Sequence, residues 1–260
     1  MPSSSSRQTS NNTLQDCDDG VLRIEAARLA FTEHCLFDGL SMTLPAHGWT
    51  CLLGRSGCGK SSLLRMIAGL PVAPDASLSV GNGAGQPLNL RVAWMAQQDL
   101  LLPWRRVIDN VSLGAAMRGE RADRERAMAL LEQVGLGHTA RRYPQTLSGG
   151  ERSRVALART LYESAPLVLM DEPFAALDAL TRLDLHALAH RLLAGRRVVM
   201  VTHDPLEALR MANQILVMRG TPARLDSLDV PSQPAPRDPA TPAMSNNHAR
   251  LLAMLDEVAA

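Results

Sequence analysis

The stretch that decides the fold is "WTCLLGRSGCGKSS", residues 49–62. Its first part is an apolar run. Its second part fits the pattern G-x-x-x-x-G-K-[S/T], with Gly54, Gly59, Lys60 and Ser61 in the fixed positions. Glycines at this spacing let backbone N–H groups wrap around phosphate oxygens, and the lysine adds a positive charge. The apolar run before the loop predicts a buried strand and "SSLLRMIAGL" after it predicts a helix, which is the context that such a loop requires. A flexible glycine loop without a ligand is the alternative.

Composition excludes several other classes of protein. The chain has 260 residues, of which 46% are hydrophobic and 20% charged, enough for a sizeable core in one or two domains. The net charge of +1 gives no overall field that favours nucleic acid or an acidic membrane surface. The four cysteines form no C-x-x-C pair, which disfavours a zinc site and favours reduced thiols. Cys58 lies inside the glycine loop, and we expect it to be a bystander rather than a nucleophile.

The two ends of the chain differ in composition from its middle. Residues 1–20 are polar and lack the apolar segment of a signal peptide, so we expect a disordered tail. No apolar run approaches the roughly 18 residues needed to span a bilayer. Six prolines in residues 221–250 predict an extended linker, and the apolar pattern after it allows one amphipathic helix. We therefore expect residues 221–260 to be a linker and a C-terminal helix outside the main domain.

The middle of the chain alternates strand-like and helix-like segments. Short strand patterns fill residues 21–43, and buried strands are predicted at 90–97, 167–170 and 197–203. Helical patterns separate the later strands, which predicts an α/β fold with a mainly parallel sheet. Residues 98–163 are predominantly helical, with Ala127, Leu130, Leu131 and Val134 on one face of a helix. They predict a helical subdomain inserted into the α/β core.

Four polar residues follow the predicted strands. Asp171 and Glu172 end one strand, where a carboxylate can hold Mg²⁺ and its neighbour can polarise an attacking water. The amide of Gln97 can meet both the metal and the water, and His203 can donate to a γ-phosphate. Each residue alone is equally consistent with a solvated turn or a structural histidine. Together they point to one site, because ligands of open α/β sheets bind outside the carboxyl ends of the strands.

The stretch "LSGGERSR", residues 147–154, places a serine and two glycines just before a predicted helix. Free backbone N–H groups at a helix start attract anions. An ordinary serine-capped helix start is the simpler interpretation of this stretch alone. Because the glycine loop already holds the phosphates, a second anion site makes sense if it closes over the nucleotide of a second copy.

These motifs together resemble the ATP-binding subunit of an ABC transporter, over residues 21–220. "GRSGCGKSS" resembles its P-loop, Gln97 its Q-loop, "LSGGE" its signature, "LMDEP" its Walker B motif, "AALD" its D-loop and "VTHD" its switch histidine. The resemblance implies a P-loop NTPase core with a mainly parallel sheet, an antiparallel β subdomain and an inserted helical subdomain at about 98–163. It also implies ATP and Mg²⁺ as ligands and a head-to-tail dimer with a second copy of the chain.

The resemblance assigns roles to individual residues. It implies that Glu172, His203 and Gln97 serve catalysis. It implies three ligands of the metal: Ser61, Gln97 and Asp171. The residues implied in nucleotide binding are Phe31, Gly54, Arg55, Ser56, Gly57, Cys58, Gly59, Lys60, Ser61 and Ser62 of one copy, with Ser148, Gly149 and Gly150 of the other. Three positions depart from the common pattern: Phe31 replaces a tyrosine, Glu151 a glutamine, and Ala175 a serine or glycine.

Two further stretches resemble the nitrate, sulfonate and taurine importers and their relatives that import pyrimidine precursors of thiamine. They are "LLPWRRVIDNV" at 101–111 and "PAPRD" at 234–238. Such a subunit sits peripherally on the cytoplasmic face of the inner membrane, bound to integral membrane permease subunits and served indirectly by a periplasmic solute-binding protein. Nucleic acid is not an expected partner. Trp104 either faces the permease or anchors the core of the helical subdomain.

Two other functions compete with this interpretation. A soluble ABC-type ATPase acting on DNA or the ribosome is the first, but chromosome-type relatives carry long coiled coils between P-loop and signature, and no sustained heptads occur here. Ribosome-type relatives usually carry two ATPase units in one chain, whereas this sequence shows the motifs of one. A P-loop kinase or GTPase is the second, and it leaves "LSGGE" and His203 unexplained.

Overall fold

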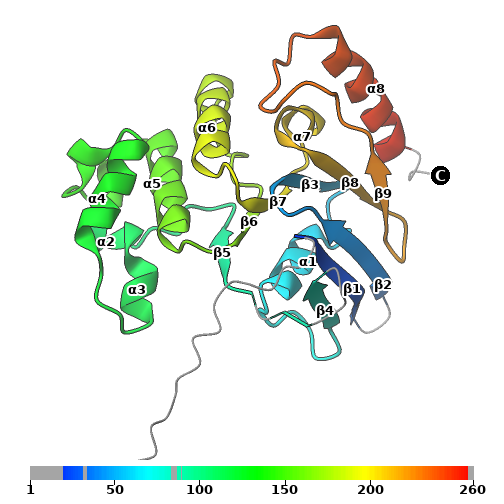
Figure 1. Ribbon diagram of the computed structural model, residues 1–260, viewed down its shortest axis with the longest axis horizontal. Coiled ribbons are helices and arrows are strands. Elements are labelled where there is room, and N and C mark those ends of the chain that lie inside the picture. Colours follow the sequence, from blue (N-terminus) through cyan, green and yellow to red (C-terminus); the bar gives the residue numbers. More distant parts are fainter. Residues whose placement is uncertain (1–19, 32–33, 83–86, 89, 257–260) are drawn as a thin grey trace, which may run out of the picture.

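The computed structural model describes residues 20–31, 34–82, 87–88 and 90–256. The predicted tail at residues 1–20 therefore lies outside the described residues, except for residue 20. Two sheets and a cluster of helices make up the described chain (Figure 1). The mainly parallel sheet, the antiparallel three-stranded sheet and the helical subdomain confirm the predicted fold class.

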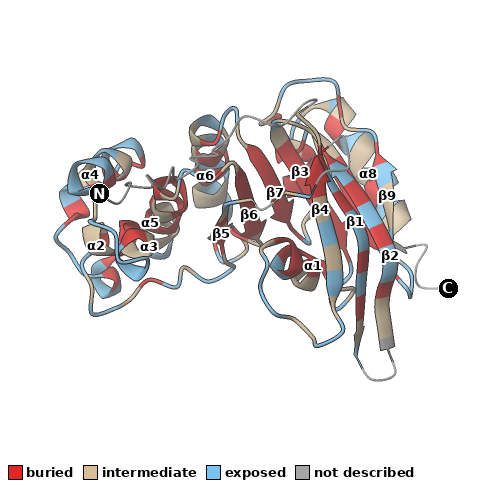
Figure 2. Ribbon diagram, turned by 60° about the horizontal axis from the view of Figure 1, so that its bottom comes forward, coloured by how far each residue is buried: buried red, intermediate tan, exposed pale blue. Residues whose placement is uncertain are grey.

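The larger sheet carries the glycine loop. Its strand order is β5-β6-β7-β3-β8-β9. The first five strands pair in parallel, and β9 pairs antiparallel with β8. Their bounds are Val92–Met95, Leu167–Asp171, Arg197–Val201, Gly48–Gly54, Gln214–Arg219 and Arg224–Leu228. The central strands are apolar and buried, as a parallel sheet covered on both faces requires (Figure 2).

Helices cover both faces of this sheet. On one face α1 (Lys60–Ile67) packs Leu63 and Leu64 against alternate strand residues such as Leu52. On the other face lie α6 (Ala179–Leu192) and α7 (Pro205–Met211). The alternation arises because successive side chains of a strand point to opposite faces. Because the first five strands are parallel, their carboxyl ends meet at one edge of the sheet between these layers.

The smaller sheet pairs β1 (Leu22–Phe31), β2 (His34–Leu44) and β4 (Ser77–Asn82) in the order β2-β1-β4. Both pairings are antiparallel, and the inward residues of β1 pack in the same core as α1. Strand β1 ends at Phe31, which pairs with His34 at the start of β2.

The helical subdomain stands beside the β5 edge of the sheet (Figure 1). It contains α2 (Val107–Val111), α3 (Leu113–Met117), α4 (Arg124–Gln133) and α5 (Gly149–Tyr162), with short 3₁₀ turns at Gly137–Thr139 and Pro144–Thr146. It has its own core. Three of the four apolar residues predicted to share a helix face, Ala127, Leu131 and Val134, are buried in it.

Residues after Gly220 differ from the predicted extended linker. Strand β9 adds to the main sheet, and α8 (Pro242–Asp256) packs on α7. Between them Arg237 is only 4% exposed, and its guanidinium donates to the carbonyls of Leu209, Ala212 and Pro231 at 2.7, 2.7 and 3.1 Å. Between β9 and α8 the proline-rich stretch at 229–241 forms no helix or strand, but long-range hydrogen bonds fix it, and composition does not reveal those bonds.

Candidate nucleotide-binding site

The glycine loop connects the end of β3 to the start of α1, and two of its glycines are required by its geometry. A Cβ atom on Gly54 would lie 2.5 Å from the carbonyl oxygen of Met218. Gly59 has φ +100°, and a Cβ there would lie 2.9 Å from the Phe37 ring. Side chains are therefore excluded at both positions. The loop between them leads directly into the N-terminus of α1, and a helix N-terminus is where backbone N–H groups bind phosphate.

Lys60 is the first residue of α1 and is only 6% exposed. Its Nζ atom donates to the carbonyls of Gly54 and Arg55 at 2.7 and 2.9 Å. The ammonium group is thus folded back over the loop, and its oxygen partners in the described part of the chain are neutral carbonyls and not a carboxylate. Lys60 is also the only lysine in the sequence, since every other basic side chain except histidine is arginine. The sequence argument overlooked this signal, which marks a position where a compact ammonium is needed instead of a planar guanidinium.

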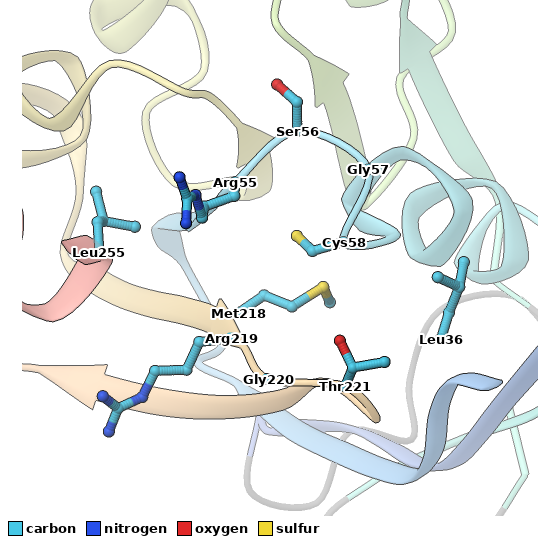
Figure 3. Close-up of a pocket in the computed structure, with 10 residues that line it drawn as sticks. All are labelled: Leu36, Arg55, Ser56, Gly57, Cys58, Met218, Arg219, Gly220, Thr221 and Leu255. Carbon is cyan, nitrogen blue, oxygen red and sulfur yellow. The ribbon is translucent and has the colours of Figure 1, made fainter. Parts of the chain in front are cut away.

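A cavity of about 290 Å³ opens beside the loop (Figure 3). Its walls come from loop residues 55–58 and from distant segments: Leu36, Met218, Arg219, Gly220, Thr221 and Leu255. Cys58 is half-buried, and its thiol lies 3.9 Å from Lys60 Nζ. Arg55, Ser56 and Gly57 are exposed at the rim, and Ser62 is half-buried behind it.

The next element of the site joins α1 to the end of β6. Ser61 Oγ donates to Asp171 Oδ1 at 2.8 Å, although 110 residues separate them. Burial raises the pKa of the Asp171 carboxyl, and the hydrogen bond from Ser61 partly opposes that rise. A hydroxyl beside a carboxylate is an oxygen donor set suited to Mg²⁺.

The ends of three neighbouring strands meet at Glu172. Its Oε2 atom accepts from Gln97 Nε2 at 3.2 Å and lies 3.0 Å from His203 Nδ1. These residues follow β6, β5 and β7 respectively. Glu172 has φ +46°, a left-handed conformation that is uncommon for a residue with a side chain. The structure therefore brings together the three residues implied in catalysis, with local backbone strain at the carboxylate.

The serine–glycine segment begins α5. Ser148 caps the helix by accepting from the backbone amide of Glu151, and Glu151 accepts from the amide of Ser148 at 2.7 Å. This reciprocal bond from the Ser148 backbone lowers the pKa of the Glu151 carboxyl. A capped helix start is therefore present, and it explains why a carboxylate is tolerated at residue 151.

The two glycines of this segment have different surroundings. A Cβ on Gly150 would lie 2.6 Å from Thr181 Cγ2, whereas a Cβ on Gly149 would meet nothing closer than 3.9 Å. Packing inside the chain explains Gly150 but not Gly149. A cavity of about 470 Å³ opens over Ser148, Gly149 and Gly150, and it shares no lining residue with the cavity beside the glycine loop. Within the described residues, the phosphate loop and the serine–glycine segment thus face different cavities.

Comparison with known proteins decides the family. The ABC transporter family model matches residues 37–175. The aliphatic sulfonates import ATP-binding protein SsuB 2 of Frankia alni is 41% identical, over 91% of this chain and 91% of that protein. This chain belongs to the ABC transporter family of ATP-binding proteins. The corresponding SsuB 1 of Pseudomonas fluorescens is 42% identical, over 94% of this chain and 91% of its own length. An uncharacterized ABC transporter ATP-binding protein of Haemophilus influenzae is 41% identical, over 84% and 91%.

Solved structures of ABC proteins share the fold. A dimeric ATP-binding cassette with ADP and phosphate bound superposes with a TM-score of 0.67 at 24% identity, covering 82% of this chain and all of that chain. This ABC ATPase binds ATP, as its family does. In the part that the structure describes, no helix is both long and apolar enough to cross a membrane.

Two aromatic residues of the ABC ATPase are displayed at its surface. Phe31 at the end of β1 is 43% exposed, which is unusual for a large apolar side chain and leaves it accessible to a ligand. Trp104 is 71% exposed and therefore does not anchor the core of the helical subdomain. The alternative that made it a core residue is wrong.

The turn carrying Trp104 is rigidly built. Asn110 is fully buried in α2, and its amide bonds the backbone of Leu102, Arg105 and Arg106 at 2.7–3.2 Å. Sequence reasoning missed this asparagine. Its role depends on the chain turning back so that Asn110 reaches Leu102, eight positions earlier.

Sequence reasoning also missed the link between the Q-loop and α5. Asp99 Oδ2 accepts from Arg152 Nε at 2.9 Å, and the carbonyl of Leu100 accepts from Arg159 Nη1 at 2.9 Å. The loop that follows β5 is thereby tied to the helix that carries the serine–glycine segment.

Proposed function

We propose that this ABC ATPase is the ATP-hydrolysing subunit of a solute importer of the sulfonate, nitrate and taurine type. The observation that carries the hydrolytic role is the meeting of Gln97, Glu172 and His203 at one carboxylate oxygen. The importer class rests on the relatives above, which are named aliphatic sulfonates import proteins. Aliphatic sulfonates are therefore the first solutes to test, with taurine, nitrate and a pyrimidine precursor of thiamine as competitors.

The proposed nucleotide site uses the glycine loop. The amides of residues 54–62 would surround the β- and γ-phosphates, and Lys60 Nζ would exchange its two carbonyl partners for phosphate oxygens. Phe31 would stack on the adenine. Ser61, Asp171 and Gln97 would hold Mg²⁺, which would supply positive charge to offset that of the phosphates.

Hydrolysis would occur at the edge where β5, β6 and β7 end. Glu172 would orient water for attack on the γ-phosphorus and take up its proton, as the bond to the ADP oxygen breaks. Gln97 and His203 both lie within hydrogen-bond distance of the same Glu172 oxygen. His203 would turn one ring nitrogen to the γ-phosphate, where an N–H donor stabilises the charge of the transition state.

The second half of the site would come from another copy. Ser148, Gly149 and Gly150 would cover the nucleotide held by the partner's glycine loop. The open space over Gly149, which packing within the chain does not explain, supports this assignment. Two such contacts, each between the glycine loop of one copy and the serine–glycine segment of the other, make a symmetric head-to-tail dimer.

Closure of that dimer would act on a permease. The exposed Trp104, on a turn held by the buried Asn110, is the residue we assign to the permease contact. The site would then lie at the cytoplasmic face of the inner membrane, with a periplasmic solute-binding protein delivering the solute.

Reconstitution tests the proposed function. The chain is co-expressed with the permease encoded beside it and purified in lipid vesicles with the neighbouring binding protein. An alkanesulfonate should raise ATP hydrolysis and accumulate inside the vesicles. Hydrolysis stimulated by DNA, RNA or ribosomes, without co-purification of a permease, would support the soluble ABC-type ATPase instead.

A further inference from the structure

A buried polar cluster lies behind the switch histidine, and the catalytic scheme above does not use it. Glu207 on α7, His186 on α6 and Thr202 after β7 are 6%, 2% and 1% exposed. Buried polar side chains are costly unless they are hydrogen-bonded, so a cluster retained in the core needs a reason.

Both carboxylate oxygens of Glu207 have partners. Oε1 lies 2.8 Å from His186 Nε2, and Oε2 accepts from the hydroxyl of Thr202. Thr202 Oγ1 in turn accepts from the backbone amide of Asp204 at 3.0 Å. The Glu207 carboxylate thus fixes Thr202, which precedes His203, and Thr202 in turn fixes Asp204, which follows His203.

The cluster also touches the segment that carries the catalytic carboxylate. The His186 ring packs edge-on against Phe174, with ring centroids 4.8 Å apart. Phe174 follows Glu172 by two residues. A second tie lies farther out, where Arg182 donates to Asp204 Oδ2 at 3.4 Å. His186 therefore contacts Phe174 on the Glu172 side directly and reaches the His203 side through Glu207 and Thr202.

One atom of the cluster has no partner. Within the described residues His186 Nδ1 is buried without a hydrogen bond. A leucine at this position would fill the space without leaving an unsatisfied nitrogen. Packing alone therefore does not explain a histidine at position 186. Its hydrogen bond to Glu207 does.

We propose that Glu207 and His186 are positioning residues for His203: they fix the turn of residues 202–204 so that the His203 ring faces Glu172 and the γ-phosphate. The inference rests on the catalytic role proposed for His203. It assigns no contact with nucleotide to either residue. Glu207 acts through Thr202, and His186 acts by holding Glu207.

Steady-state ATP hydrolysis in a double-mutant cycle tests this inference. Glu207→Gln should lower kcat about tenfold or more and leave the Kd for ATP within about twofold, because binding residues are not touched. In a His203→Ala background the same substitution should change kcat less than about twofold, since the turn then has no ring to position. An equal loss in both backgrounds would show a merely structural role and overturn the inference.

Two further variants keep the test open if Glu207→Gln does not fold. In His186→Gln the side-chain amide can still donate to Glu207, so kcat should stay near that of the wild type. His186→Leu removes the donor and should lower kcat as Glu207→Gln does. Equal kcat values for these two variants would overturn the role of His186.

A matched control separates positioning from loss of stability. Thr160 on α5 is also 2% exposed, and its hydroxyl donates to Ala156 O at 2.9 Å, away from the cluster. Thr160→Val should lower the melting temperature without changing kcat. The imidazole NMR signals of His203 should shift in Glu207→Gln and not in Thr160→Val.

The outcomes also distinguish this inference from the proposed function. Wild-type turnover in His203→Ala would contradict the role of the switch histidine and with it this inference. Turnover that depends on His203 but not on Glu207 or His186 would overturn this inference alone.

Discussion

The Nδ1 atom of His203 lies 3.0 Å from the Oε2 atom of Glu172, although 31 positions separate the two residues. The register of two strands creates this contact. Strands β6 and β7 pair in parallel with Asp171 beside Val201, so the residues that follow them leave the sheet together. The approach of these two side chains follows from strand register.

Glu172→Gln should abolish turnover while preserving nucleotide binding. The amide keeps the shape of the side chain but does not accept a proton, so we expect kcat to fall by about 100-fold or more. ATP should then accumulate in a stable dimer, visible by size-exclusion chromatography. Continued hydrolysis, or a monomer with ATP bound, would contradict the role assigned to Glu172.

Lys60 should be needed as a lysine and not only as a cation. Lys60→Ala should weaken ATP binding about tenfold or more, because charge-assisted hydrogen bonds to the phosphates are lost. Lys60→Arg keeps the charge, but its planar fork does not fit the loop, so we expect a similar loss. Titration calorimetry measures both. Because no other lysine is present, pyridoxal phosphate followed by borohydride should label one side-chain amine, and ATP should block the labelling.

Two neighbouring glycines of the signature should respond differently to alanine. Gly150→Ala forces a methyl group to within 2.6 Å of Thr181 Cγ2, so it should destabilise the free chain by about 1–3 kcal/mol. Gly149→Ala has room and should leave the unfolding free energy within about 0.5 kcal/mol. It should nevertheless weaken the ATP-dependent dimer, because the methyl group occupies the partner's approach. Urea unfolding and sedimentation measure the two effects, and a normal ATP-dependent dimer in Gly149→Ala would contradict the assignment.

The raised pKa of Asp171 predicts a pH-dependent stability. A carboxyl whose pKa is higher in the folded chain binds more protons there, so stability falls as the pH rises through the range between its ordinary value and its raised value. Asp171→Asn removes this titration. In metal-free buffer the variant should melt at a higher temperature than the wild type at about pH 7, and the difference should shrink toward about pH 4. If the difference in melting temperature grew as the pH fell, burial would not be the cause of the raised pKa of Asp171.

Much of this architecture is visible in the sequence because it rests on local patterns. The loop at 54–61 combines fixed glycine spacing with a strand before it and a helix after it, and apolar runs mark the central strands. Asp171, Glu172 and His203 could be found because each follows such a run. The sheet register then brings them together, as expected from parallel strands.

What sequence reasoning missed depends on contacts between distant segments. Arg237 lies in a proline-rich stretch whose composition is typical of a linker, yet three carbonyls bind its guanidinium. His186 and Glu207 lie on two different helices, and only the packing of α6 beside α7 makes them a pair. Asn110 has no motif at all, since its partners are backbone atoms of a turn.

Complementation between two inactive variants tests the shared nucleotide site most directly. Lys60→Ala removes the phosphate grip of one copy, and Ser148→Arg blocks the covering segment of the other. If each site combines the glycine loop of one copy with the signature of its twin, a mixed dimer of these variants contains one intact site, and mixing should restore up to about a quarter of wild-type hydrolysis. Activity no higher than the sum of the separate variants, with mixed dimers demonstrated, would contradict the account.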